Sequence, residues 1–243
     1  MNTTRITPIG AGRRGTAGRR RIAGAAVVLV AVSTGCGQAV SGTPVAESAM
    51  SMRHVEAPIA ELLPTPGQFP SRYPAVALPP QAAAAAAGDL DGVGMGATVS
   101  PVECTPPDPE SDVEPAAVAV GTDDATRASL TVELSRTTEG LAVVRARLDA
   151  CEEIRVRRAG AGSTVTTVLD EAALPGADEA ISLRRTVIPD VGGQGLTQTM
   201  QSSVGRVGDV RITVTSMIFG AGEPDTAAVA ELFATTVRGI RTR

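Results

Sequence analysis

Residues 202–216 read SSVGRVGDVRITVTS, and the architecture can be worked out from this segment. Its second half alternates apolar residues with arginine and threonine, which is the period of two expected of a half-buried β-strand. GRVGD at 205–209 is a short glycine-bearing turn, and PDVGGQG at 189–195 is a second one. Turns of this kind favour hairpins over parallel crossovers. We therefore predict consecutive antiparallel strands in the last part of the chain.

Strand patterns extend back toward the middle of the sequence. Residues 130–134 alternate apolar and polar side chains as residues 210–214 do. Weaker strand patterns occur at 116–120, 153–158, 164–169, 181–188 and 196–204. Together these segments predict a mostly antiparallel sheet.

Helix patterns lie around and between these strands. A short helix is predicted at Ile59–Leu63, and a second in the alanine run 82–87, which follows two prolines. Apolar residues recur at helical spacing over 141–151 and place Cys151 on the apolar side. A last helix begins near Glu223, and its apolar stripe is Val229, Leu232 or Phe233, Val237 and Ile240. Helices packed on an antiparallel sheet define an α+β fold, here in one domain.

The N-terminus has the layout of an export signal. Residues 1–21 carry six arginines and no acid, and the apolar run Ile22–Val32 is shorter than the roughly 20 residues that span a membrane. Small residues then precede Cys36, as in the lipobox of bacterial lipoproteins, although Ser33 stands where that motif usually has leucine. We predict a signal peptide over 1–35 and a diacylated thiol at Cys36. The alternative is an ordinary signal peptide cut nearby, with Cys36 incidental.

The chain after Cys36 is polar and rich in small residues as far as residue 56. This composition predicts a flexible, lipidated tether over 36–56 and a folded domain over 57–243. The lipid would hold the domain on the extracytoplasmic face of the cell membrane.

Composition disfavours two classes of partner. The chain after the predicted cut keeps all 26 acids but 16 of the 22 basic residues, a formal charge of −10, which disfavours nucleic-acid binding. Only one tyrosine, three phenylalanines and no tryptophan are present, so sugar binding on aromatic platforms is disfavoured. Every basic residue is arginine, which fits the high-GC genome of an actinobacterium.

Few catalytic or metal-binding arrangements can be built from these residues. The single histidine, His54, lies in the predicted tether, which leaves no histidine-based triad inside the domain. The domain has two cysteines and no further histidine, too few soft ligands for zinc. Asp89–Gly96 lacks the glutamate of a calcium loop and the lysine of a phosphate loop, and a turn is the better interpretation. We predict no catalytic residue, no metal ligand and no cofactor.

Adjacent carboxylates occur at Asp123–Asp124, Glu152–Glu153 and Asp178–Glu179. Sequence neighbours usually point apart, so we interpret these pairs as solvated surface. A hydrolase built on carboxylates alone remains the enzymatic alternative.

Arg185 breaks the pattern of its own strand. In ISLRRTVI, residues 181–188, every second residue from Ile181 is apolar except Arg185, which falls on the same side. Either the strand is irregular there, or the arginine is exposed with its stem packed, or its guanidinium meets a buried acid or an anionic ligand. We take Arg185 as the candidate ligand-binding residue, for an anion.

Cys104 and Cys151 are predicted to form a disulfide. An exported chain meets oxidising conditions, and lipidation of Cys36 leaves an even pair of cysteines in the domain.

Several segments resemble a known group of proteins. Beside the lipobox these are LLPTPGQFPSRYP, VSPVECTPP, RLDACEEI and DTAAVAELFATTVRGI, which resemble mycobacterial lipoproteins of uncharacterised function. Those lipoproteins are similar to the extracellular sensor domain of the mycobacterial serine/threonine kinase PknH. The resemblance covers most of 57–243 and implies an antiparallel sheet flanked by helices, a cleft, disulfides and a ligand-binding role. Such sensor domains carry two disulfides, whereas this domain has cysteines for one.

We therefore expect a sensor-like, non-catalytic domain that is held to the membrane by its lipid and binds an unknown small molecule or lipid. Alternatives are a carrier of an apolar lipid in an internal cavity, the carboxylate-based hydrolase, and a purely structural or protein-binding role.

Overall fold

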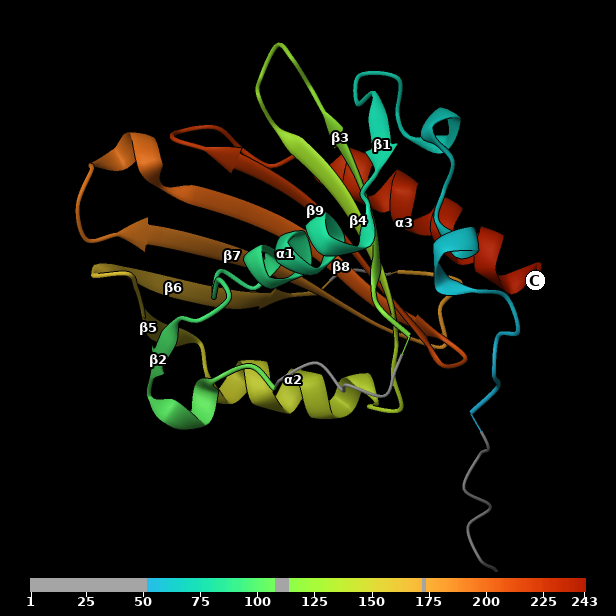
Figure 1. Ribbon diagram of the computed structural model, residues 1–243, viewed down its shortest axis with the longest axis horizontal. Helices are drawn as coiled ribbons and strands as arrows, with labels where there is room; N and C mark the ends of the chain where they lie inside the picture. Colours follow the sequence, from blue (N-terminus) through green and yellow to red (C-terminus); the bar gives the residue numbers. More distant parts are fainter. Residues whose placement is uncertain (1–51, 108–113, 172–173) are drawn as a thin grey trace, which may run out of the picture. The chain divides into compact units, whose positions relative to one another are not determined.

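The computed structural model describes residues 52–107, 114–171 and 174–243 (Figure 1). The predicted signal peptide, Cys36 and almost all of the predicted tether lie outside the described residues. Nine strands form one sheet in the order β1-β3-β4-β9-β8-β7-β6-β5-β2. All neighbouring strands pair antiparallel. The predicted α+β class with an antiparallel sheet is therefore confirmed.

The strands are β1 (Ala75–Ala77), β2 (Thr98–Ser100), β3 (Ala117–Thr122), β4 (Ser129–Arg136), β5 (Glu153–Arg158), β6 (Ala161–Asp170), β7 (Glu179–Pro189), β8 (Gln198–Val207) and β9 (Val210–Phe219). The predicted strand segments correspond to β3 to β9. The sequence gives no signal for β1 and β2, because each is three residues long and buries one side chain. Both predicted turns join hairpins, β7–β8 and β8–β9.

The helices are α1 (Pro80–Leu90), α2 (Leu141–Ala150) and α3 (Thr226–Arg241), with short 3-10 helices η1 (Ile59–Leu62), η2 (Pro66–Gln68), η3 (Val102–Cys104) and η4 (Gln194–Leu196). The helices expected near 59–63, 82–87, 141–151 and in the last segment are all present. Asp225 caps α3, and its side chain accepts a hydrogen bond from the backbone nitrogen of Ala228 at 3.0 Å.

The main core lies between α3 and one face of the sheet, which we call the α3 face. Ile212 and Val214 of β9 are fully buried there, together with Leu130 and Val132 of β4. The predicted stripe of α3 is buried against them, and it consists of Val229, Leu232, Phe233, Val237 and Ile240. The alternation of β4 and β9 thus points its apolar residues at α3, and hydrophobic burial holds this layer together.

The opposite face of the sheet carries α1 and α2 (Figure 1). Leu141 of α2 packs with Ile181, Leu183 and Val204 of β7 and β8. A disulfide links Cys104 and Cys151, whose Cα atoms are 5.7 Å apart. The predicted disulfide is therefore present, and it joins η3 to the end of α2.

Polar residues on this second face are covered as well. Strands that alternate apolar and polar residues are expected to leave the polar side in water, yet Thr131, Ser202 and Thr215 are at most 5% exposed. Figure 1 shows the reason, because α1 crosses this face over the central strands. The hydroxyls of Ser202 and Thr215 bond to each other at 2.8 Å, which compensates their burial.

The packed chain begins earlier than the predicted domain start at residue 57. Val55 is 1% exposed and belongs to the main core, and its backbone nitrogen donates to Asp209 at 3.0 Å. Residues 53–56, which composition assigns to the tether, therefore lie on the folded domain.

Candidate binding pockets

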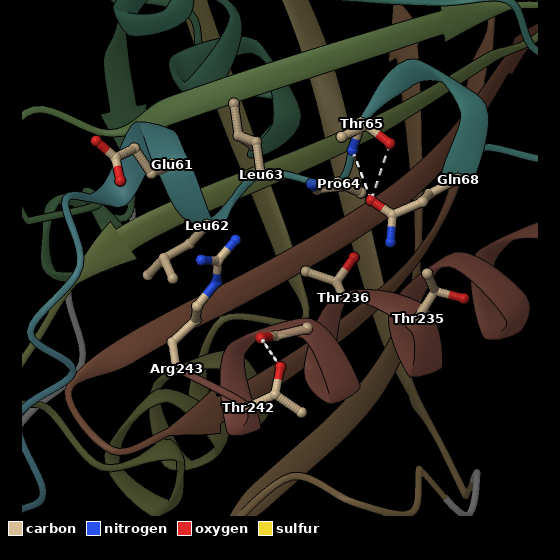
Figure 2. Close-up of a pocket in the computed structure, with 11 residues that line it drawn as sticks. Glu61, Leu62, Leu63, Pro64, Thr65, Gln68, Thr235, Thr236, Thr242 and Arg243 are labelled. Atoms are coloured by element: carbon tan, nitrogen blue, oxygen red, sulfur yellow. Dashed lines mark hydrogen bonds between the residues drawn. The ribbon is translucent and has the colours of Figure 1, made fainter.

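One pocket of about 430 Å³ lies between the segment 61–68 and the C-terminal half of α3 (Figure 2), and we call it the α3 pocket. Its lining is mostly polar, with one acid, one arginine and several neutral side chains, and the wall formed by 61–68 adds an apolar strip. The lining residues are Glu61, Leu62, Leu63, Pro64, Thr65, Gln68, Thr235, Thr236, Gly239, Thr242 and Arg243. The wall and the helix are far apart in sequence, and no alternation or spacing marks these residues as one site.

The polar groups of the α3 pocket offer both donors and acceptors. Gln68 accepts from the backbone nitrogen and hydroxyl of Thr65 at 2.8 and 3.0 Å, and Figure 2 shows its amide nitrogen directed away from Thr65 toward α3. The hydroxyls of Thr236 and Thr242 donate to their own helix at 2.8 and 2.9 Å, so their oxygens are left to accept. Arg243 also lines the pocket, and Figure 2 shows its side chain extending from the end of α3 toward the segment 61–68.

Gly239 leaves open space in the wall that α3 provides. A Cβ atom built on Gly239 meets no other heavy atom within 4 Å. Because Gly239 sits inside α3 with ordinary helical geometry, the methyl group of an alanine can be placed there without a clash. This position therefore gives direct experimental control over the pocket.

A second pocket of about 420 Å³ lies at the C-terminal end of α2 beside β6. Its charged groups are three acids and one arginine, namely Asp149, Glu152, Glu171 and Arg145. This excess of negative charge disfavours an anionic ligand. The second pocket includes Glu152 of the adjacent carboxylates.

Arg185 lines neither of these two pockets. It lies on a regular strand, is 8% exposed, and donates to the carbonyl oxygen of Leu90 at 2.8 Å and to the Thr167 hydroxyl at 3.2 Å. Burial lowers the pKa of Arg185, while the carboxylate of Asp91, 3.5 Å away, raises it. Leu90 is the last residue of α1, so the guanidinium caps the C-terminal end of that helix. Binding of an anion by Arg185 stays a prediction.

Glu133 is a titratable group that the sequence pattern does not single out. It lies on β4, on the face covered by α1 and α2, and is only partly exposed. The pKa of Glu133 is raised to about 7, chiefly by burial and in addition by the charge of Asp91, while the charge of Arg211 acts in the opposite direction. The alternation of β4 predicts that this side chain faces water, because nothing in the local pattern shows that α1 crosses it.

The other candidate residues take part in contacts within the fold. The carboxylate of Asp123 accepts hydrogen bonds from the Arg72 guanidinium at 2.8 Å and from the Thr126 hydroxyl at 2.9 Å. Asp178 pairs with Arg241, and Glu179 pairs with Arg206. Within residues 52–107, 114–171 and 174–243, no group of three or more histidine, cysteine or carboxylate residues could hold a metal. In the same ranges, no helix is long and apolar enough to cross a membrane.

Comparisons with known proteins find similar solved structures but no matching family or curated protein. No protein-family profile matches the chain, and no curated protein matches it. The structure is similar to an uncharacterised protein from Mycobacterium smegmatis, the Rv0999 ortholog, with a TM-score of 0.46 and 14% identity over 76% of this chain and 97% of that one. It is also similar to the extracellular domain of PknH from Mycobacterium tuberculosis, with a TM-score of 0.43 and 12% identity over 74% of this chain and 98% of that one. The extracellular domain of PknH, to which the sequence shows a resemblance, is thus among the similar structures.

Proposed function

We propose that this protein is a lipid-anchored, sensor-like component of the cell envelope whose domain binds a ligand in the α3 pocket without transforming it. The lining of that pocket carries the proposal. Threonine hydroxyls and the Gln68 amide both recognise hydroxyl and carbonyl groups, and Leu62, Leu63 and Pro64 offer an apolar wall. A small polar molecule or the headgroup of a lipid has this chemistry.

Anchoring at the outer face of the membrane is supported by two features. The signal-like N-terminus ends at Cys36, where a bacterial lipoprotein would be acylated. The disulfide Cys104–Cys151 is of the kind that persists in oxidising compartments outside the cytoplasm. Replacement of Cys36 by alanine is expected to move the protein from the membrane fraction to the soluble fraction.

The chemistry of the pocket favours binding over catalysis. Among the described residues that line it, Glu61 is the one carboxylate and Arg243 the one cation. Hydrolysis by a carboxylate mechanism needs two such groups at a defined separation, and activation of a threonine hydroxyl needs a neighbouring base. The side chains of Thr236 and Thr242 instead donate to carbonyl oxygens of α3.

Native mass spectrometry of the acylated protein from its own membrane tests the proposal. A co-purifying mass is expected on the unmodified protein and on the matched control Gly239→Ala, and it should be weakened or lost in Gly239→Leu, whose larger side chain is introduced at a residue that lines the pocket. The mass of the co-purifying molecule tells whether it is a small polar molecule or a lipid. Retention of the same mass in Gly239→Leu would show that the ligand binds elsewhere.

A further inference from the structure

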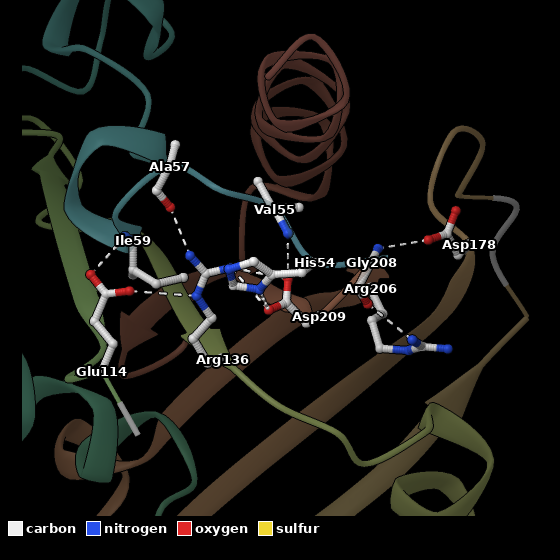
Figure 3. A network of polar contacts seen from close by, with 10 residues as sticks. All are labelled: His54, Val55, Ala57, Ile59, Glu114, Arg136, Asp178, Arg206, Gly208 and Asp209. Carbon is white, nitrogen blue, oxygen red and sulfur yellow. Dashed lines mark hydrogen bonds and ion pairs between the residues drawn. The ribbon is translucent and has the colours of Figure 1, made fainter. Parts of the chain in front are cut away.

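We propose that the segment Arg53–Ile59, here called the N-terminal latch, controls the α3 pocket by holding its 61–68 wall in place. The inference rests on the proposed function, since it concerns regulation of the same pocket. Release of the latch would loosen the wall, and occupation of the pocket would tighten the latch. Figure 3 shows four residues of the latch, and their polar side-chain partners are Asp209, Arg136 and Glu114.

Asp209, in the turn between β8 and β9, holds the first part of the latch. Its carboxylate accepts the backbone nitrogen of Val55 at 3.0 Å and lies 2.5 Å from Nδ1 of His54. Its backbone nitrogen donates to the carbonyl oxygen of Arg53 at 3.0 Å. One turn residue thus fixes three successive latch residues.

Arg136, the last residue of β4, connects this turn to the second part of the latch. Its Nη1 lies 3.0 and 3.1 Å from the two carboxylate oxygens of Asp209, and its Nη2 donates to the carbonyl oxygen of Ala57 at 2.7 Å. Glu114 accepts from the backbone nitrogen of Ile59 at 2.9 Å and pairs with Arg136 at 3.4 Å. The Arg136 side chain is 12% exposed, so these charge-assisted bonds are poorly screened by water.

The latch lies closely against the turn. Gly208 has a φ of +58°, and a Cβ atom on it would collide with the carbonyl oxygen of Arg53. Glycine is therefore required here for two reasons: the backbone has a left-handed conformation, and a second chain segment approaches too closely to leave room for a side chain.

The latch leads directly into the pocket wall. Ile59 is the first residue of η1 and is fully buried, and Leu62, which ends η1, is 6% exposed and lines the pocket. Only two residues, Leu63 and Pro64, separate η1 from the Thr65–Gln68 part of the lining. A displacement of Ile59 would therefore be passed directly to the residues of the wall.

The chain that enters the latch comes from the predicted lipid anchor. Arg53 follows Cys36 by 17 residues, and the latch is the first segment of the described chain that is hydrogen-bonded to the sheet and its turns. Coupling between two sites is reciprocal in free energy, so if the closed latch strengthens binding in the pocket, a bound ligand stabilises the closed latch by the same amount.

A single introduced tryptophan tests this coupling without a known ligand. The natural chain contains no tryptophan, and Gly239→Trp would place an indole against the 61–68 wall as a tethered occupant of the pocket. We expect blue-shifted emission from this variant in the full chain. By reciprocity, hydrogen exchange at the amides of Val55 and Ile59 should be slower than in Gly239→Ala.

The latch is then opened by Arg136→Gln in the Gly239→Trp chain. Exchange at Val55 and Ile59 should be about tenfold faster or more, because charge-assisted hydrogen bonds are lost, and the emission should shift to longer wavelength. Exchange in α3 should stay unchanged. Arg155→Gln is the matched control, since Arg155 is 54% exposed and pairs with Asp190 outside the latch.

Two results would overturn the coupling. One is faster hydrogen exchange at Val55 and Ile59 in the Arg136→Gln variant while the tryptophan emission and the hydrogen exchange at 61–68 stay unchanged. In that case the pocket would be a binding site that the latch does not regulate. The other is equal exchange at the latch in Gly239→Trp and Gly239→Ala. If Arg136→Gln does not fold, His54→Ala removes one exposed latch contact and should give the same changes on a smaller scale. Failure of the proposed function appears separately, as loss of any co-purifying mass with the coupling intact.

Discussion

Arg136 and Asp209 meet across the end of the sheet, with one guanidinium nitrogen 3.0 and 3.1 Å from both carboxylate oxygens. Burial acts to raise the pKa of Asp209, but the Val55 amide, His54 and the charge of Arg136 outweigh it and leave the pKa below its ordinary value. The carboxylate therefore stabilises the fold in its ionised form.

Asp209→Asn should lower the free energy of unfolding by about 1–3 kcal/mol at pH 7, because a charged acceptor of several hydrogen bonds is lost. A carboxyl whose folded pKa is lowered contributes above its unfolded pKa of about 3.9 and loses that contribution as the pH falls through the folded value. The difference between the two proteins should thus shrink between pH 5 and pH 2 in urea unfolding. Asp124→Asn, at an exposed acid, is the control. A difference that is constant over this range would contradict the assignment.

Glu133 should show the opposite dependence on pH. A carboxyl with a raised folded pKa costs no stability below its unfolded value near 4.5 and costs progressively more as the pH rises to about 7. Glu133→Gln is expected to stabilise the domain by about 1–3 kcal/mol at pH 8, after allowance for partial exposure, and by almost nothing at pH 4. Urea unfolding of the unmodified protein and of Glu133→Gln at pH 4 and pH 8 tests this prediction. A glutamine variant that is less stable than the unmodified protein at pH 8 would refute it.

Two glycines should respond in opposite ways to a methyl group. A Cβ atom on Gly205 of β8 would lie 2.5 Å from the Phe233 ring, so Gly205→Ala should cost about 1–3 kcal/mol through overpacking. Gly239 has open space, and Gly239→Ala should gain about 0.5–1 kcal/mol from helix propensity. Thermal unfolding of the two variants measures both effects. A stabilising Gly205→Ala would mean that α3 packs less closely on β8 than described.

Loss of the disulfide should weaken the domain without changing its topology. The bond closes a loop over a sequence separation of 47 residues, which corresponds to about 4 kcal/mol on the chain-entropy estimate. The double variant Cys104→Ser, Cys151→Ser should therefore unfold at lower urea concentration, while the main core between α3 and the sheet remains. Thiol titration of the unfolded, unreduced domain without Cys36 should detect no free thiol.

The sequence predicts the sheet and its main core well because local patterns carry them. The alternation in β4 and β9 and the stripe of α3 each report which side chains are buried, and the structure confirms them. The positions of α1 and of the latch depend on contacts between distant residues. No period in the segment 129–136 shows that Glu133 is covered, and the tether-like composition before residue 57 does not show that Val55 is buried.

The α3 pocket could not be predicted for a related reason. Its hydroxyls and its single amide are common surface residues, and only the folding of 61–68 against α3 makes them one lining. Arg185 is the instructive opposite case. The sequence correctly shows that Arg185 interrupts an apolar face. Its partner, however, is the backbone carbonyl oxygen of Leu90, and because every residue type carries such an oxygen the sequence cannot identify it.

Replacing Arg185 distinguishes its two roles. As the cap of α1, its loss leaves the Leu90 carbonyl oxygen and the Thr167 hydroxyl without their donor in a buried site, so Arg185→Ala should cost about 2–4 kcal/mol. Hydrogen exchange should accelerate most in the last turn of α1. Arg185→Lys should recover only part of the loss, because an ammonium cannot reproduce the two directions of the guanidinium.

The predicted anion contact has a different signature in the same variant. If Arg185 binds an anion from outside, Arg185→Ala should unfold at nearly the same urea concentration as the unmodified domain and lose its stabilisation by added inorganic phosphate. Unchanged exchange in α1 together with that loss would overturn the capping role. Because Arg185 is 8% exposed and its guanidinium is already bonded to α1 and β6, we expect destabilisation with no phosphate effect in either protein.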